Sequence, residues 1–187
     1  MENFEKAISA LGKQLIDAGI DISSWGTGRA KTLVHLQNEI ESGEIILVTG
    51  KNGELLRKVA IGGADIYYQS PNGKKYHLKE DRQVFKDGRE RRRNLEQAVS
   101  EKMKLGEDPR IAIIRGIQEE LGIRGEINLV ATGTDKQKIT SPSYPGLESQ
   151  YILHKFRVVL TEEQFNSEGY REDQSDKSTY FVWKEVK

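Results

Sequence analysis

The chain has 187 residues, its 29 lysines and arginines balance 29 aspartates and glutamates, and it contains no cysteine. This length suits one domain, or one domain with a small appendage, and it can bury a substantial core. A net charge of zero gives no global attraction to nucleic acid or to an anionic membrane, so neither is an expected partner. The lack of cysteine excludes disulfides, zinc-thiolate sites and thiol nucleophiles. The first residues lack the basic-then-apolar pattern of a signal peptide and no apolar run reaches membrane-spanning length, so we expect a cytoplasmic protein.

Residues 1–43 are expected to form a helical extension. Apolar residues recur there at steps of three and four, which predicts one buried helical stripe: Phe4, Ile8, Leu11 and Leu15. Gly19 suits the end of this first helix. A second helix is predicted from Thr32, a residue type that caps helix N-termini, to Gly43.

From residue 44 the pattern changes to that of strands. Runs rich in isoleucine, leucine and valine, together with their flanking turns, predict strands at 44–49, 55–61, 64–69 and 75–78. The segment 70–73 reads as a hairpin turn. A second hairpin is predicted around Asp87 and Gly88, with arms at 82–86 and 89–93.

One strong helix follows, and its ends are marked by local chemistry. Asp108 suits the N-cap and Pro109 the first helical position, where the missing N–H costs nothing. Gly122 suits a left-handed cap at the other end. The spacing of apolar residues predicts a buried stripe made of Ile111, Ile114, Ile117 and Leu121.

The last third of the chain predicts further strands at 127–132, 151–160 and 179–186, with a capped helical turn at 161–165. The polar segment 169–177 is expected to be mobile. Antiparallel hairpins, one central helix and more strands predict an α+β sandwich. We expect two parts, a helical extension at 1–43 and a main domain at 44–187.

The helix after Pro109 carries adjacent carboxylates, Glu119 and Glu120, one turn after Arg115. Residues three and four apart share a helix face, so Arg115 neighbours Glu119, and Gly116 neighbours both glutamates. Carboxylates at close quarters repel one another unless a cation lies among them or water screens them. Oxygen-only ligation favours Mg²⁺ or Mn²⁺. By themselves, however, adjacent glutamates on a helix are more often a solvated surface.

The segment 101–123 resembles the Nudix box, G-x5-E-x7-R-E-U-x-E-E-x-G-U, in which U is a bulky aliphatic residue. Seven of its nine specified positions match in register: Glu107, Arg115, Ile117, Glu119, Glu120, Gly122 and Ile123. The resemblance implies a Nudix-like α/β/α sandwich with a mixed sheet, and a loop-helix that holds Mg²⁺ or Mn²⁺. It also implies water attack on the pyrophosphate bond of a nucleoside diphosphate linked to another moiety.

The resemblance assigns roles by position. Glu119 and Glu120 would be metal ligands and catalytic residues. Arg115 would orient glutamate carboxylates through a salt bridge, and Glu107 would support the loop. Many members dimerise, so a homodimer is one expected assembly.

Two positions depart from the box. Glu101 replaces its leading glycine, and Gly116 replaces the glutamate that follows the arginine. That glutamate is a metal ligand or base in many members. Glycine costs about 1 kcal/mol relative to alanine inside a helix, which points to relaxed function or to a need for space.

Two interpretations follow from these departures. In the first, Glu101 supplies the missing carboxylate as a metal ligand and catalytic group, and other candidates for the base are Glu148, Glu162 and Glu163. In the second, catalysis is lost and the domain is a non-catalytic Nudix-like module that binds a nucleotide or phosphorylated ligand. The presence of both Glu119 and Glu120 favours activity. A third hypothesis is an interaction protein that assembles through its N-terminal helices.

Two further features are candidates for substrate binding. Arg91 and Arg93 lie on a predicted hairpin arm, where alternation puts both on one face and where arginine suits bidentate phosphate contacts. The alternative is a solvated edge strand protected by charge. Tyr144, in the loop at 141–148, could stack on a base or could be a packed tyrosine in a rigid turn.

Overall fold

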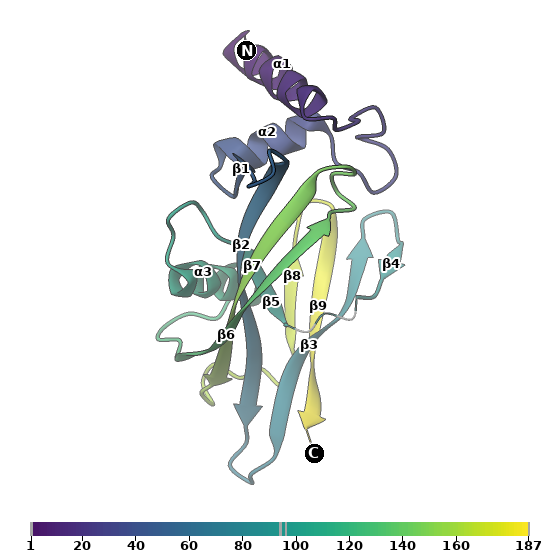
Figure 1. Cartoon of the computed structure of the whole chain (residues 1–187). Coiled ribbons are helices and arrows are strands. Elements are labelled where there is room, and N and C mark those ends of the chain that lie inside the picture. Colours follow the sequence, from purple (N-terminus) through teal and green to yellow (C-terminus); the bar gives the residue numbers. More distant parts are fainter. Residues whose placement is uncertain (1, 94, 96, 187) are drawn as a thin grey trace. The chain divides into compact units, whose positions relative to one another are not determined.

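The computed structural model describes residues 2–93, 95 and 97–186, which form three helices and nine strands (Figure 1). In chain order these are α1 (Glu2–Asp17), α2 (Leu33–Glu41), β1 (Ile45–Thr49), β2 (Leu55–Gln69), β3 (Lys75–Phe85), β4 (Glu90–Arg91), β5 (Val99–Lys102), α3 (Pro109–Leu121), β6 (Leu129–Thr140), β7 (Glu148–Leu160), β8 (Tyr170–Asp173) and β9 (Lys177–Val186). The predicted α+β class, with helices at the N-terminus, is confirmed. None of the helices in these described ranges has the length and apolar composition needed to cross a membrane.

The strands hydrogen-bond in the order β6-β7-β2-β3-β9-β8, with β1 and β5 paired to β2 and β4 paired to β3. The chain forms two compact units. Unit 1 contains residues 1–60, 102–107 and 135–152, and unit 2 contains residues 61–101, 108–134 and 153–187. Three long strands, β2, β6 and β7, contribute residues to both units. The boundary expected at residue 43 stays a prediction.

In unit 1 the two predicted helices are confirmed. Gly19 follows α1 with a φ of 78°, a left-handed conformation that ends the helix at little cost for glycine. Thr32 caps α2, since its side chain accepts a hydrogen bond from the backbone N–H of His35 at 3.2 Å.

The strands predicted at 55–61 and 64–69 are one continuous strand, β2, so the break expected between them is wrong. Gly62 and Gly63 instead allow close packing, and a Cβ on Gly62 would lie 3.3 Å from the Cβ of Ile113 in α3. The strands predicted at 75–78 and 82–86 likewise form one strand, β3. An irregularity in its pairing with β9 lies between Glu80 and Arg82, which explains the interrupted pattern.

Residues 169–177, expected to be a mobile polar segment, are in part a regular strand. They contain β8, whose residues Tyr170–Asp173 pair with β9 in an antiparallel register from Tyr170↔Phe181 to Asp173↔Ser178. This strand places Glu172 beside the core of unit 2. The short strand β5 was not predicted at all.

Helix α3 has the predicted ends, but it turns a different face to the core. The side chain of Asp108 accepts a hydrogen bond from the backbone N–H of Arg110 at 2.7 Å, and Gly122 has a φ of 67°. Ile111, predicted to be buried, is 61% exposed. The buried face consists of Ala112, Ile113, Gly116, Ile117 and Leu121. Gly116 therefore faces the sheet and not the solvent.

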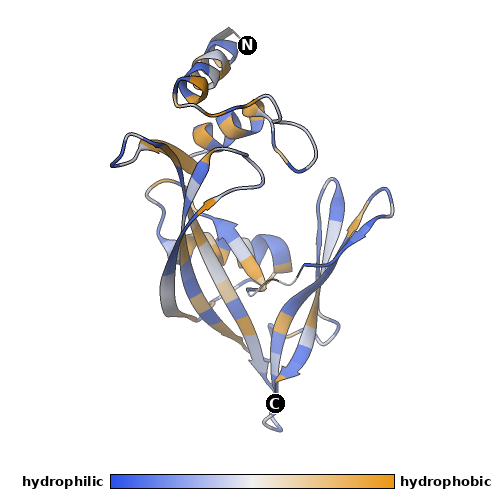
Figure 2. Ribbon diagram, turned by 45° about the vertical axis from the view of Figure 1, so that its right-hand side comes forward, coloured by the Kyte–Doolittle hydropathy of each residue, from blue (hydrophilic) through white to orange (hydrophobic). Residues whose placement is uncertain are grey.

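The core of unit 2 lies between α3 and one face of the sheet. It combines residues from α3, β2, β3, β5, β6, β7 and β9. Alternate residues along each strand point to opposite faces, and the long strands in Figure 2 show the resulting alternation of apolar and polar positions. On β2 the core positions are Ala64, Ile66 and Tyr68.

Candidate active site

Unit 2 contains a hollow of about 340 Å³ in which five glutamates converge. We call it the acidic pocket. Its glutamates come from four elements: Glu80 on β3, Glu101 on β5, Glu119 and Glu120 on α3, and Glu172 on β8. Arg93 and Lys177 are the basic residues among its described lining. The fold thus gathers the two adjacent glutamates of the Nudix-like segment with three carboxylates distant in sequence.

Glu120 has the most perturbed carboxyl group of this pocket. Burial raises the pKa of Glu120 to about 8, and the charges of Glu172, Glu101 and Glu80 add to the effect, while Arg93 opposes it. A carboxyl group in such surroundings holds its proton near neutral pH unless a positive charge compensates it. Perturbed groups of this kind concentrate at functional sites.

Arg93 supplies part of the compensating charge. Its Nε donates to Oε1 of Glu80 at 2.8 Å, and a second guanidinium nitrogen donates to Oε2 of the same carboxylate. The Glu80 side chain is only 2% exposed, whereas that of Arg93 is 36% exposed. This two-point pairing fixes the guanidinium at the pocket, where it also raises the pKa of Arg93 itself.

Glu101 and Gly116, the two positions that depart from the Nudix box, lie in direct contact. A Cβ placed on Gly116 would lie 2.9 Å from the Cβ of Glu101 and 3.2 Å from Cγ1 of Val99. Real Cβ atoms essentially never approach that closely, so the backbone of α3 needs glycine where it packs on β5. The Glu101 carboxylate accepts a hydrogen bond from Arg115 at 2.5 Å. Of the two explanations for Gly116, the need for space is the one that the geometry supports.

The structure brings four of the predicted site residues into the acidic pocket: Glu101, Glu119, Glu120 and Arg93. Arg115 joins them indirectly, through Glu101. Arg91 is exposed, and its Nε donates to Oε1 of Gln83 at 3.0 Å, a residue that itself lines the pocket.

Glu107 and Tyr144 belong to unit 1. The Glu107 carboxylate accepts from the backbone N–H of Lys104 at 2.7 Å, which closes the turn before α3. Tyr144 is fully buried, with its ring 5.2 Å from that of Trp25 and 5.0 Å from the guanidinium of Arg57. This is the packing expected of the tyrosine in a rigid turn, and stacking of Tyr144 on a base stays a prediction.

The alternative bases do not line the acidic pocket in the described part of the chain. Glu148 pairs with Lys138 at 2.7 Å in unit 1. Glu162 and Glu163 are exposed in the turn after β7. Glu80 and Glu172 are residues that sequence reasoning missed. The sequence could have indicated Glu80, because it lies two positions after the apolar Leu78 on the same strand and therefore on the same face of the sheet.

The pocket offers carboxylate oxygens, the donors that Mg²⁺ and Mn²⁺ prefer. Within residues 2–93, 95 and 97–186, however, no three acidic or histidine side chains lie close enough together to hold a metal ion. The donor chemistry therefore fits a hard cation. The side chains would have to rotate toward one another to enclose it.

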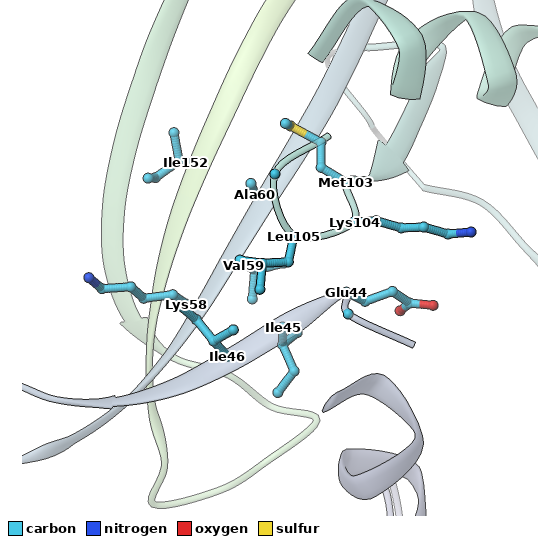
Figure 3. Close-up of a pocket in the computed structure, with 12 residues that line it drawn as sticks. Glu44, Ile45, Ile46, Lys58, Val59, Ala60, Met103, Lys104, Leu105 and Ile152 are labelled. Carbon is cyan, nitrogen blue, oxygen red and sulfur yellow. The ribbon is translucent and has the colours of Figure 1, made fainter. Parts of the chain in front are cut away.

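A second hollow, of about 190 Å³, lies in unit 1 and is mainly apolar (Figure 3). Ile45, Val59, Met103 and Leu105 line it. Its one described carboxylate, Glu44, pairs with Lys102 at 2.7 Å. Because it lacks converging polar groups, it is a weaker candidate for catalysis than the acidic pocket.

Unit 1 also contains a buried ionic cluster around Glu39. Its carboxylate lies 2.7 Å from Lys31, 2.8 Å from Arg57 and 3.0 Å from Lys102. Burial alone would raise the pKa of Glu39, but hydrogen bonds from the three cations lower it to about 2. Arg57 is only 3% exposed, so this pair forms part of the interior.

Comparison with known proteins gives no family assignment. No family model matches the chain, and no curated protein matches it. Among solved structures, an Ap4A hydrolase of C. elegans is 17% identical, with 68% of this chain and 80% of that chain covered and a TM-score of 0.39. A Nudix hydrolase of M. smegmatis, RenU, is 13% identical, with 75% and 79% covered and a TM-score of 0.36. Because both TM-scores are below 0.5, these resemblances add no weight to the case for a fold family or a function.

Proposed function

We propose that this chain is a Nudix-type hydrolase that depends on Mg²⁺ or Mn²⁺ and cleaves the pyrophosphate bond of a nucleoside diphosphate linked to another moiety. The observation that carries the proposal is the contact between Glu101 and Gly116. The two departures from the box are a reciprocal exchange of glycine and glutamate. The contact puts the side chain of Glu101 beside the position at which the box has its glutamate.

In this proposal the residues of the acidic pocket have separate roles. Glu119, Glu120 and Glu101 would hold the cation, and Glu101 would replace the glutamate that normally follows the arginine. Arg115 would orient Glu101 through their ion pair, and Glu107 would support the loop that enters α3. When bound, the cation would neutralise charge on the leaving phosphate and lower the pKa of a water molecule.

The substrate-binding roles belong to the basic side chains. Arg93 is held by Glu80 with its guanidinium at the pocket, where it could contact substrate phosphates. Arg91 and Tyr144 are further proposed contacts, and each would have to change its present partners to reach a ligand. The expected homodimer and the division into residues 1–43 and 44–187 are retained as proposals.

The sharpest test is to reverse the exchange. The variants are Glu101→Gly, Gly116→Glu and the double variant. They would be assayed with Mg²⁺ and with Mn²⁺ on a panel of nucleoside diphosphate derivatives. Each single variant should lose most activity. Glu101→Gly lacks the carboxylate, and Gly116→Glu has no room for the added side chain beside Glu101. The double variant moves the carboxylate back to the helix and should recover at least part of the activity.

A second candidate function is a non-catalytic module that binds a nucleotide or phosphorylated ligand. The absence of a closed set of three ligands among the described residues favours it. This candidate predicts that ligands raise the melting temperature without product formation. If the unmodified protein turns over no substrate of the panel with either cation, the hydrolase proposal is lost and this candidate remains.

A further inference from the structure

The sheet of unit 2 has a second face, opposite α3 and the acidic pocket. Strand pairing identifies its residues, because directly paired positions point the same way. Gln69 pairs with Lys75 and Tyr67 with His77 between β2 and β3, and His77 pairs with Lys184 on β9. Core residues such as Leu78 and Phe156 alternate with them and point to the other side. We call this second face the basic sheet face.

The basic sheet face is rich in cations. Its strands β2, β3, β7 and β9 place five lysines and arginines there: Lys75, Lys79, Lys155, Arg157 and Lys184. Asp65 is a carboxylate on the same face, and it lies 3.1 Å from Nε2 of His77. The net charge of zero thus hides a segregation within unit 2, with glutamates on one side of the sheet and cations on the other.

The same face carries stacked flat groups. The rings of Tyr67 and His77 lie 4.4 Å apart with an interplanar angle of 19°, and the guanidinium of Arg157 lies 5.5 Å from the Tyr67 ring. A hollow of about 290 Å³ lies beside them, lined by Tyr67, Tyr68, Gln69, Lys75, Arg157 and Val159. Aromatic and guanidinium planes on a sheet are the groups on which unpaired bases stack.

We propose that the basic sheet face binds single-stranded nucleic acid, with the lysines on the phosphates and a base stacked on the exposed guanidinium of Arg157, which lies over the Tyr67 ring. Two features favour this occupant over an anionic membrane. The exposed apolar residues of this face are valines such as Val159, whose short side chains would insert only shallowly into a bilayer. The Arg157 guanidinium, supported by the stacked rings of Tyr67 and His77, provides a platform for a flat base, and a lipid headgroup has no flat base to place there.

The test measures fluorescence anisotropy of labelled single-stranded RNA and DNA dodecamers with the full chain in EDTA, so that metal-dependent cleavage does not enter. The charge variant is Lys75→Glu/Lys184→Glu. Its matched control, Lys13→Glu/Lys51→Glu, changes the net charge equally at exposed residues of unit 1. The stacking variant is Tyr67→Leu, with circular dichroism and melting temperature as checks on folding.

We expect saturable binding that weakens as salt rises. The charge variant should bind at least tenfold more weakly and should lower the slope of log K against log salt by about 2, one for each phosphate contact removed. Tyr67→Leu should weaken binding roughly tenfold and leave that slope unchanged. The control pair should behave like the unmodified chain.

Three results would overturn the proposal: no binding of either strand at low salt, equal losses in the charge variant and its control, or tighter binding to phosphatidylserine vesicles than to the oligonucleotides. If Tyr67→Leu is unstable, Arg157→Lys provides a second variant, which keeps the charge but removes the planar group. An unchanged affinity in Arg157→Lys would exclude stacking at this position.

Discussion

The side chain of Glu101 fills the space that a side chain at residue 116 would need, because a Cβ on Gly116 would lie 2.9 Å from the Cβ of Glu101. Residue 101 lies on β5 and residue 116 on α3, so the relationship is a packing contact between two elements. A substitution at either position must therefore be interpreted together with the other residue.

Gly116→Ala should destabilise the protein, although alanine is the better helix former by about 1 kcal/mol. The added methyl group would overpack the contact with Glu101, at a cost of roughly 1–3 kcal/mol. Urea denaturation measures the loss. Gly12→Ala in α1 is the matched control, since its Cβ would meet only the movable end of the Leu33 side chain, at 3.2 Å, and the distal methyl of Ile22. Combining Gly116→Ala with Glu101→Gly should recover much of the loss, and additive losses would contradict the contact.

Glu120→Gln should stabilise the cation-free protein at high pH. The folded-state pKa of Glu120, about 8, lies above the ordinary glutamate value of 4.5, so the native state binds the extra proton between these values. Stability due to this group is therefore greatest below about pH 4.5 and falls as the pH rises toward 8. Thermal unfolding in EDTA should show a gain on the order of 1–2 kcal/mol for Glu120→Gln at pH 8.5 and little at pH 5.

Adding Mg²⁺ or Mn²⁺ at pH 8.5 should stabilise the unmodified protein, and the stabilisation should be smaller in Glu120→Gln.

The control for the pH-dependent gain of Glu120→Gln is Glu119→Gln, a substitution at an exposed neighbouring position. An equal response of both variants to pH would show that the burial of Glu120 is not the cause.

Arg93→Ala should destabilise the protein by roughly 3 kcal/mol, because it leaves the buried Glu80 carboxylate without its two-point partner. Arg92→Ala is the control, since Arg92 is 62% exposed and its pairing with Asp81 is worth less than about 1 kcal/mol. Chemical denaturation at pH 7 compares the two. Equal losses of stability in the two variants would show that Arg93 does not compensate a buried charge on Glu80.

Glu39→Gln should cost roughly 3–5 kcal/mol at pH 7, since it leaves buried cations uncompensated. The pKa of Glu39 is lowered to about 2, so its stabilising contribution is present above about pH 4.5 and is lost as the pH falls toward 2. The difference in unfolding free energy between the unmodified protein and Glu39→Gln should therefore shrink in acid. Asp17→Asn, at an exposed ion pair with Lys13, should change stability by less than about 0.5 kcal/mol.

Local chemistry predicted the ends of α3 well, because Asp108, Pro109 and Gly122 act on their own helix. The buried face was harder to predict. Gly116 carries no side chain, so it contributes nothing to an apolar pattern, yet the close approach of β5 places it in the core. That approach turns Ile111 toward solvent, where it is 61% exposed.

The spacing of the Nudix-like segment predicted which glutamates gather on α3, and it identified Glu101 as the residue to examine. It could not predict Glu172, because β8 is a short polar strand that is held by its pairing with β9, and such pairing leaves no local signal in the sequence. The basic sheet face could not be predicted from the sequence for a related reason. A balanced composition does not show how strand alternation sorts charges between two faces.

The ionic cluster around Glu39 has a consequence for the ancestry of the chain. Glu39 lies on α2, whereas its partners Arg57 and Lys102 lie on β2 and β5. Loss of residues 1–43 would leave the guanidinium of Arg57 without its anion. Because a buried guanidinium without an anion is unfavourable, we expect gain or loss of the N-terminal helices to be accompanied by a change at residue 57. A relative without these helices should carry an uncharged residue at that position.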